Sequence, residues 1–467
     1  MVETVQTVVV GAGIWGLACG RQLLKQIPRD SLLILDCQER AGGKLNTISS
    51  AGFRFETAAN GFLDSNPATL NLCRELGLAS SLVRASGTAS RNRFVYLRGK
   101  LHKLPSNLWG ALTTSLLSWN ARWRIATERF RSPAIPSYDE SISEFGRRRL
   151  GPELTDTLLN AFVTGIWGGD AEKLSLRSCF PKWHEWESRY GSLTGGIVAR
   201  RKERITAARL RGEQPPGPPQ MWSLSGGLNE LMAAMSRECV DRLRLNAAVA
   251  EIRFHGHRVP KWDVVLDNGR IIQAENVVMA NPPDKQAAIV NRLDDELSAE
   301  ITQIPSNSIS VVVLGFETQR LPEGLDGFGY LTPYRDGRPV LGVQWCSEIF
   351  PGLRAPQGKS IWRALVRGGG QFESGVGESF LIQSVMSELR LVLGIKAEPV
   401  FNSVIHWPRA IPQYVVGHAE RVRRISTITA RWPGLFLGGS GYQGVAINDC
   451  VEQAQLLAQK IACSPHH

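Results

Sequence analysis

The sequence predicts an α/β protein with more than one domain, and three observations support this prediction. Residues 8–36 combine an apolar run, a glycine turn, a helical segment, a second apolar run and an acidic residue. Strand-like and helical patterns alternate along the rest of the chain, whose 467 residues suffice for about two to three domains. A second glycine turn, between a short apolar run and a helical pattern, follows at 435–446.

The first glycine turn has the GxGxxG spacing of a dinucleotide-binding βαβ unit. We expect Gly11 to allow the turn, Gly13 to let backbone N–H groups approach a pyrophosphate, and Gly16 to let the helix pack on the strand. Asp36, at the end of the second apolar run, would accept hydrogen bonds from a ribose hydroxyl. The segment therefore predicts a Rossmann-like domain.

The residues after Asp36 indicate which dinucleotide is bound. They continue as acid-x3-R-x-G-G-[RK], with Arg40, Gly42, Gly43 and Lys44 at the specified positions. This pattern, followed by GFRFE at 52–56, resembles the flavin-containing amine oxidase superfamily, which implies FAD. An NAD site, the alternative, would leave the segment 40–44 without a role. We therefore expect non-covalent FAD.

The second glycine turn, in PGLFLGGSGYQGVAINDC, predicts the other part of the flavin site. The helix expected after it would direct free N–H groups and its positive dipole end towards the flavin, which stabilises the reduced form. The residues expected to bind FAD here are Gly439, Ser440, Gly444, Val445 and Ala446, and Val249 joins them from a strand-like segment.

Between the two turns, local patterns predict further elements. RNRFVYLRGKLHKLP predicts a β-hairpin that turns at Arg98-Gly99, and DNG at 267–269 predicts another. Strands are expected at 308–316 and 339–345, and helices from 138 to 212. A proline run within 215–219 indicates a domain boundary.

The composition limits the expected partners. A net charge of +11 suits nucleic acid, an anionic membrane or an acidic substrate. Nucleic-acid motifs are absent, so no nucleic acid is expected. Eight scattered cysteines without a CxxC pair suit a reducing compartment and predict no metal site. With no leader and no apolar run of ~18 residues, a cytoplasmic protein, peripherally associated with a membrane, is expected.

The segment 106–131 predicts an amphipathic helix. Its apolar positions are Trp109, Leu112, Leu116, Leu117, Trp119 and Trp123, and its basic positions are Arg122, Arg124 and Arg129. Tryptophan and leucine opposite arginine are typical of a helix in a membrane interface. The alternative is a helix packed on its own domain core with a solvated basic face.

From about Val8 to the last expected helix, the chain is similar to the protoporphyrinogen oxidase family of the heme pathway. The similar segments are GIWGGDAEKLSLRSCFP, WSLSGGL, GFGYL, IPQYVVGH and GYQGVAINDC. The resemblance implies a discontinuous FAD-binding domain at 1–90, 215–285 and 401–463. It also implies a mixed-sheet substrate domain at 286–400 with part of 91–105, and a helical membrane-binding subdomain at 106–214.

The resemblance implies six-electron oxidation of protoporphyrinogen IX, with reoxidation of the flavin by oxygen and release of hydrogen peroxide. A large apolar disc with two propionates requires an apolar slot with a cation at its rim. By motif, Arg93 pairs with propionates, Phe328 and Leu331 sandwich a pyrrole, Val366 forms a third apolar wall, and the Gly165 backbone approaches the substrate. No side chain is predicted as a general base, because positioning and flavin electronics suffice for hydride transfer.

Three departures from the family pattern concern the shape of the substrate site. Ala58-Ala59 stand where relatives usually carry Gly-Pro, Lys44 replaces the commoner arginine, and Trp167 replaces a smaller residue. The alternative functions are coproporphyrinogen III oxidation on the same fold, another amine or carotenoid oxidase, and a flavin-binding scaffold without turnover. Ferrochelatase or a second copy of the chain is a further expected partner.

Overall fold

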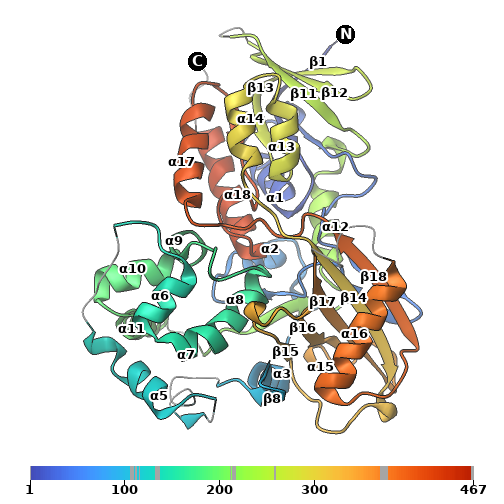
Figure 1. The fold of residues 1–467 in the computed structure, drawn as a ribbon. Coiled ribbons are helices and arrows are strands. Elements are labelled where there is room, and N and C mark those ends of the chain that lie inside the picture. Colours follow the sequence, from blue (N-terminus) through green and yellow to red (C-terminus); the bar gives the residue numbers. More distant parts are fainter. Residues whose placement is uncertain are drawn as a thin grey trace.

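The computed structural model describes residues 2–105, 110, 113–114, 116–131, 137–210, 212, 217–256, 259–368 and 377–463. Trp109, Leu112 and the start of the proline run at 215–216 lie outside these residues. Two seven-stranded sheets and a group of helices form three neighbouring parts (Figure 1). The prediction of an α/β fold is confirmed.

The first sheet joins strands from three distant parts of the chain, in the order β10-β2-β1-β13-β12-β11, with β19 beside β13. Its strands are β1 (Glu3–Val10), β2 (Leu32–Leu35), β10 (Leu243–Arg244), β11 (Val249–Phe254), β12 (Trp262–Leu266), β13 (Ile271–Met279) and β19 (Leu435–Leu437). The pairs β2–β1, β1–β13 and β13–β19 are parallel, so their carboxyl ends meet at one edge. Ligands of doubly wound sheets bind at this edge.

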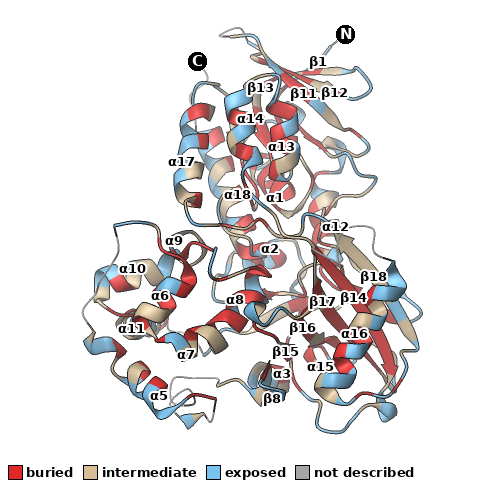
Figure 2. Cartoon of the chain, viewed as in Figure 1, coloured by how far each residue is buried: buried red, intermediate tan, exposed pale blue. Residues whose placement is uncertain are grey.

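Helices cover both faces of the first sheet. One face packs against α1 (Ile14–Leu23), α2 (Ala68–Glu75), α12 (Asn229–Glu238) and α18 (Ile447–Ala462). The other face packs against α13 (Pro283–Val290), α14 (Asp295–Thr302) and α17 (His418–Thr429). The central strands are therefore apolar and buried on both sides (Figure 2). A small sheet with the strand order β5 (Phe62–Leu63), β9 (Met221–Leu224) and β6 (Leu82–Arg84) lies beside them.

The second sheet has the order β18-β14-β17-β16-β15-β7-β8 and is antiparallel except for the parallel pair β15–β7. Its strands are β7 (Arg93–Leu97), β8 (Lys100–Lys103), β14 (Ile309–Glu317), β15 (Gly329–Leu331), β16 (Val340–Trp345), β17 (Lys359–Arg367) and β18 (Phe401–Trp407). The predicted hairpin at Arg98-Gly99 is confirmed, with positive φ at both residues. Because β18 pairs with β14, residue 401 begins a strand of the second sheet, and not one of the nucleotide-side sheet.

The two faces of the second sheet pack against different elements. α16 (Glu378–Leu393) covers one face. The other face meets the hairpin of β3 (Thr47–Ser50) and β4 (Phe53–Glu56) near β14 and β17, and α8 (Asn160–Trp167) near β15. We call this second face the site face.

The prediction that helices predominate from 138 to 212 is confirmed. They are α6 (Ile142–Arg149), α7 (Pro152–Leu154), α8, α9 (Leu176–Cys179), α10 (Pro181–Tyr190) and α11 (Leu193–Leu210). The prediction of one helix over 106–131 is wrong, because Ser118 caps a new helix, α5 (Trp119–Ala126), after a turn at 116–117. No helix among the described residues combines the length and apolar character needed to cross a membrane.

Candidate functional site

The first glycine turn connects β1 to α1. Gly11 has a φ of +110°, which favours glycine, and its N–H donates to the Leu35 carbonyl at 2.7 Å. A Cβ at Gly16 would lie 1.9 Å from the Gly11 carbonyl oxygen, so only glycine lets α1 pack this closely on the turn. Gly13 pairs with Gly42 in an isolated parallel bridge, which brings the two predicted FAD motifs together.

The carboxylate of Asp36 lies over this turn. Its Oδ2 accepts from the Ala12 N–H at 2.6 Å, and its Oδ1 accepts from the Gln38 N–H at 2.8 Å. The Ala247 N–H donates to the Asp36 carbonyl, so the strand that starts at Val249 begins close to this acidic residue. Turn, acid and Val249 are thus neighbours at the carboxyl end of β2.

Lys44 joins the glycine-rich segment to the loop after β18. Its Nζ donates to the carbonyls of Arg409 and Ala410, both at 2.5 Å. Burial lowers the pKa of Lys44 to about 8, and nearby Asp284 opposes this shift. Arg40 turns inward, with Nη2 donating to the Gly43 carbonyl at 2.8 Å. Arg40 therefore holds the backbone of the glycine-rich segment, and Lys44 ties this segment to the loop after β18.

The second glycine turn, between β19 and α18, lies beside the first. A Cβ at Gly438 would lie 2.3 Å from the Trp15 ring of α1. Cβ atoms built on Gly11 and on Gly439 would both approach residues 280–281, at the end of β13. The Asn281 Oδ1 is buried there without a hydrogen-bond partner among the described residues. Two convergent glycine turns and this unpaired acceptor fit a bound dinucleotide.

The remaining predicted flavin contacts lie in this second turn. Gly444 has a φ of +70°, and Val445 and Ala446 lead directly into α18. The Ser440 carbonyl accepts from the Tyr414 hydroxyl at 2.6 Å. Cys450 is buried inside α18, which suits a packing role.

Four of the five predicted substrate residues meet near β15. The Arg93 guanidinium lies 5.0 Å from the centre of the Phe328 ring, and Arg93 pairs in register with Gly329. A Cβ at Gly165 would lie 2.8 Å from Leu331 Cδ1, so α8 crosses β15 at close range. Arg93 has no acidic partner among the described residues, and the surrounding protein lowers its pKa by desolvation. The cluster thus places an uncompensated cation beside apolar side chains.

The structure does not bring Val366 to this cluster. Val366 is fully buried against α16, on the face that it shares with Trp362 and Ala364. Because side chains alternate along a strand, Arg363 and Leu365 lie on the site face instead. Only the register of β17 decides between these faces.

Register also identifies site-face residues that the sequence prediction missed. Gly342 lies between Leu365 and Leu331 on neighbouring strands, and its lack of a side chain leaves room next to Leu331. Gln344 is half-buried one step further along β16, and its Oε1 accepts from Arg363 Nη1 at 3.3 Å. Arg363 Nη2 also donates to the Ala58 carbonyl at 2.5 Å, so this arginine fixes the segment that departs from the family pattern. Alternation holds only along 342–345, because the register is irregular between Val340 and Gly342, so the sequence pattern alone does not identify this face.

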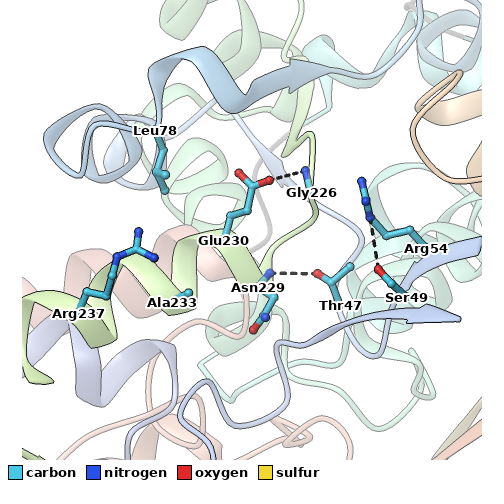
Figure 3. A pocket seen from close by; sticks show the side chains of 9 residues that line it. All are labelled: Thr47, Ser49, Arg54, Leu78, Gly226, Asn229, Glu230, Ala233 and Arg237. Atoms are coloured by element: carbon cyan, nitrogen blue, oxygen red, sulfur yellow. Dashed lines mark hydrogen bonds between the residues drawn. The ribbon is translucent and has the colours of Figure 1, made fainter. Parts of the chain in front are cut away.

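A cavity of about 420 Å³ lies elsewhere, along α12 (Figure 3). It is lined by Thr47, Ser49, Arg54, Leu78, Gly226, Asn229, Glu230, Ala233 and Arg237. Asn229, Ala233 and Arg237 repeat one helical turn apart and face the cavity, whereas Met232 faces Gly42. The cavity is therefore separated from the glycine turns by the helix itself.

The two glycine turns, at 11–16 and 438–446, define an FAD-binding oxidoreductase. Residues 15–462 match the family described as flavin containing amine oxidoreductase, and the chain belongs to this family. It is an FAD-dependent oxidase, which confirms the predicted cofactor. That FAD is held non-covalently stays a prediction.

Similar proteins narrow the class further. The chain is 31% identical to the chloroplastic protoporphyrinogen oxidase of Nicotiana tabacum, over 97% of this chain and 85% of the relative. It is 27% identical to the coproporphyrinogen III oxidase of Bacillus subtilis (strain 168), over 96% of both chains. A crystal structure from Exiguobacterium sp. 255-15 has the same fold, with a TM-score of 0.80, 24% identity and 99% of both chains covered.

Proposed function

We propose that this chain oxidises a porphyrinogen to the porphyrin, and specifically protoporphyrinogen IX to protoporphyrin IX. The observation that carries the proposal is the meeting of β7, the segment 328–331 and α8, which places Arg93 beside Phe328 and Gly165 beside Leu331. A cation beside an apolar surface with glycine gaps suits a flat apolar disc that carries carboxylates. Relatives named for protoporphyrinogen and for coproporphyrinogen III oxidation support the substrate class.

The residues of this chain would bind and orient both reactants. The N–H groups at Gly11–Gly16 would hold the pyrophosphate of FAD, and Asp36 its ribose. Bound FAD supplies a two-electron acceptor, and oxygen would take up each electron pair with two protons to form hydrogen peroxide. Arg93 would hold the propionates while Leu331 and Leu365 contact the macrocycle. We assign no side chain as a general base, because orientation is the contribution that the chain makes.

The test is aerobic turnover of protoporphyrinogen IX beside coproporphyrinogen III, followed by porphyrin fluorescence, with enzyme-free autoxidation subtracted. Preference for the dicarboxylate supports the proposal. Preference for the tetracarboxylate assigns the second function, which the similarity to the Bacillus subtilis enzyme favours. A yellow protein that is bleached by neither substrate under anaerobic conditions would reject both functions.

We also propose that α5 attaches the protein to an anionic membrane surface. Trp119, Trp123 and Phe130 are 81%, 73% and 83% exposed, whereas Ala121 and Ile125 face the core. An isolated exposed apolar residue is ordinary, but two tryptophans one turn apart on an exposed face are typical of interfacial helices. The +11 charge of the chain would favour anionic lipid.

Vesicle co-sedimentation tests this attachment. Replacing Trp119 and Trp123 by serine should release the protein from vesicles of anionic phospholipid, because both rings would lose their apolar contact. Leu391→Ser, at another exposed apolar residue on α16, is the matched control and should bind as the parent protein does. Equal binding of all three proteins would reject the attachment.

The division into domains belongs to the same proposal. The first sheet, with the segments 1–90, 215–285 and part of 401–463, would hold FAD, and the second sheet the porphyrinogen. The helices of 106–214 would then form the membrane-facing part. Ferrochelatase or a second copy of the chain as partner stays a prediction.

A further inference from the structure

Three buried side chains hold alternate carbonyl groups of the second glycine turn. Gln286 of α13 donates from Nε2 to the Gly438 carbonyl at 2.8 Å. The Tyr414 hydroxyl donates to the Ser440 carbonyl at 2.6 Å. Nε2 of His418, at the start of α17, lies 3.4 Å from the Tyr442 carbonyl. All three side chains come from outside β19 and α18, and each is at most 1% exposed.

By holding these carbonyls, the three side chains also fix the direction of the neighbouring N–H groups. A planar trans peptide directs its C=O and the following N–H in opposite directions. Carbonyls held outward at 438, 440 and 442 therefore turn the N–H groups of Gly439, Gly441 and Gln443 the other way. The N–H groups of Gly439 and Gly441 have no hydrogen-bond partner in the part of the chain that the structure describes. The turn thus presents a set of unpaired donors opposite its three anchors.

A stack of rings supports the anchors. The Tyr414 and His418 rings are parallel, with centroids 4.0 Å apart and an angle of 8° between their planes. The Trp167 ring of α8 also packs against Tyr414, with ring centroids 4.8 Å apart. Because a carbonyl can only accept, a hydrogen bond to Tyr442 requires the His418 tautomer with a proton on Nε2. Burial lowers the pKa of His418 to about 4, so the ring is neutral at pH 7.

We propose that Tyr414, together with Gln286 and His418, is a positioning residue for FAD. By holding the carbonyls, these side chains fix the direction of the N–H groups of the turn, which would donate to acceptor atoms of bound FAD. The donors then stabilise the negative charge of reduced flavin. This role concerns the cofactor alone and does not depend on which porphyrinogen is oxidised.

Tyr414→Phe tests the role, because it removes the hydroxyl and keeps the ring stack. We expect the dissociation constant for FAD to rise roughly three- to tenfold, the effect of losing one ordinary hydrogen bond. We also expect a lower flavin reduction potential and a changed visible flavin spectrum. Tyr330→Phe is the matched control, since Tyr330 is a buried tyrosine of the second sheet whose hydroxyl has no partner among the described residues. It should change none of the three quantities.

The outcomes separate a positioning role from a merely structural one. A lower melting temperature with unchanged FAD affinity and potential in Tyr414→Phe would overturn the proposal. If that variant does not fold, His418→Gln and His418→Leu replace it, because only glutamine can still donate to the Tyr442 carbonyl. Equal potentials in these two variants would likewise reject the role. All measurements use the full chain without porphyrinogen, so failure of the proposed substrate does not affect them.

Discussion

Replacement of Arg93 by alanine should weaken porphyrinogen binding more than it slows turnover. Arg93 lies beside Phe328 and has no acidic partner among the described residues, so a substrate carboxylate would be its first counter-ion. A charge-assisted hydrogen bond contributes about 1.5–3 kcal/mol. Although the protein partly desolvates Arg93, its side chain is still exposed, so solvent screening reduces this contribution to about 1–2 kcal/mol. We therefore expect KM to rise roughly five- to thirtyfold, with kcat changed less than about twofold.

Steady-state turnover of protoporphyrinogen IX at saturating oxygen measures both constants. Arg91→Ala is the matched control, because it removes the same charge from an exposed residue at the end of α3 (Gly87–Arg91). It should leave KM unchanged, which excludes a general effect of net charge. An unchanged KM in Arg93→Ala, or an equal rise in both variants, would refute a direct contact between Arg93 and the propionates.

Three further changes test the buried charges. FAD affinity should fall between pH 7 and 9.5, because Lys44 loses its proton near pH 8, and Lys44→Arg should keep the affinity constant over this range. The free energy of unfolding should fall by about 2–3 kcal/mol between pH 6.5 and 4.5. In this range His418 binds a proton in the unfolded chain but not in the folded protein, where its pKa is about 4. His418→Gln should remove this loss of stability. Glu128→Gln should lower the free energy of unfolding in urea by about 3–5 kcal/mol, because it breaks the buried ion pair with Arg149, whose other carboxylate, on Glu187, lies 3.5 Å away.

Each of these expectations has a contrary result. A pH profile for FAD binding that is the same in Lys44→Arg and the parent protein would show that another group titrates. An acid loss of stability that persists unchanged in His418→Gln would exclude His418 as its cause. For Glu128, a double variant that also carries Arg149→Met should recover much of the lost stability, and failure to recover any would exclude the charge pair.

Local patterns in the sequence were sufficient for the nucleotide-binding elements. The strand 32–35, the strand 435–437 and the turns at Arg98-Gly99 and Gly269 are as predicted, because each depends on a short apolar run or on residues that tolerate positive φ. The FAD motifs are equally local, since their glycines avoid a clash with atoms of the adjoining strand or turn. The helical segment 106–131 was predicted too long, because its tryptophans suggested one continuous face.

The substrate cluster depended on information that no local pattern holds. Val366 and Leu365 differ by one position, and only the pairing of β17 with β16 places Leu365 on the site face. Gln344 was not predicted, because its contact with Arg363 joins residues that are neighbours only in the sheet.

The sequence by itself determined the family, the cofactor and the composition of the two glycine turns. Positions such as Gly11 and Gly16 require a residue without a side chain for local steric reasons, so the motif can be recognised from the sequence. Only the tertiary structure decided that both turns flank the end of β13, and that Gln286, Tyr414 and His418 surround the second turn. Those side chains lie more than 20 residues from the carbonyls that they hold, and closing such distances depends on the packing of whole helices on the sheet.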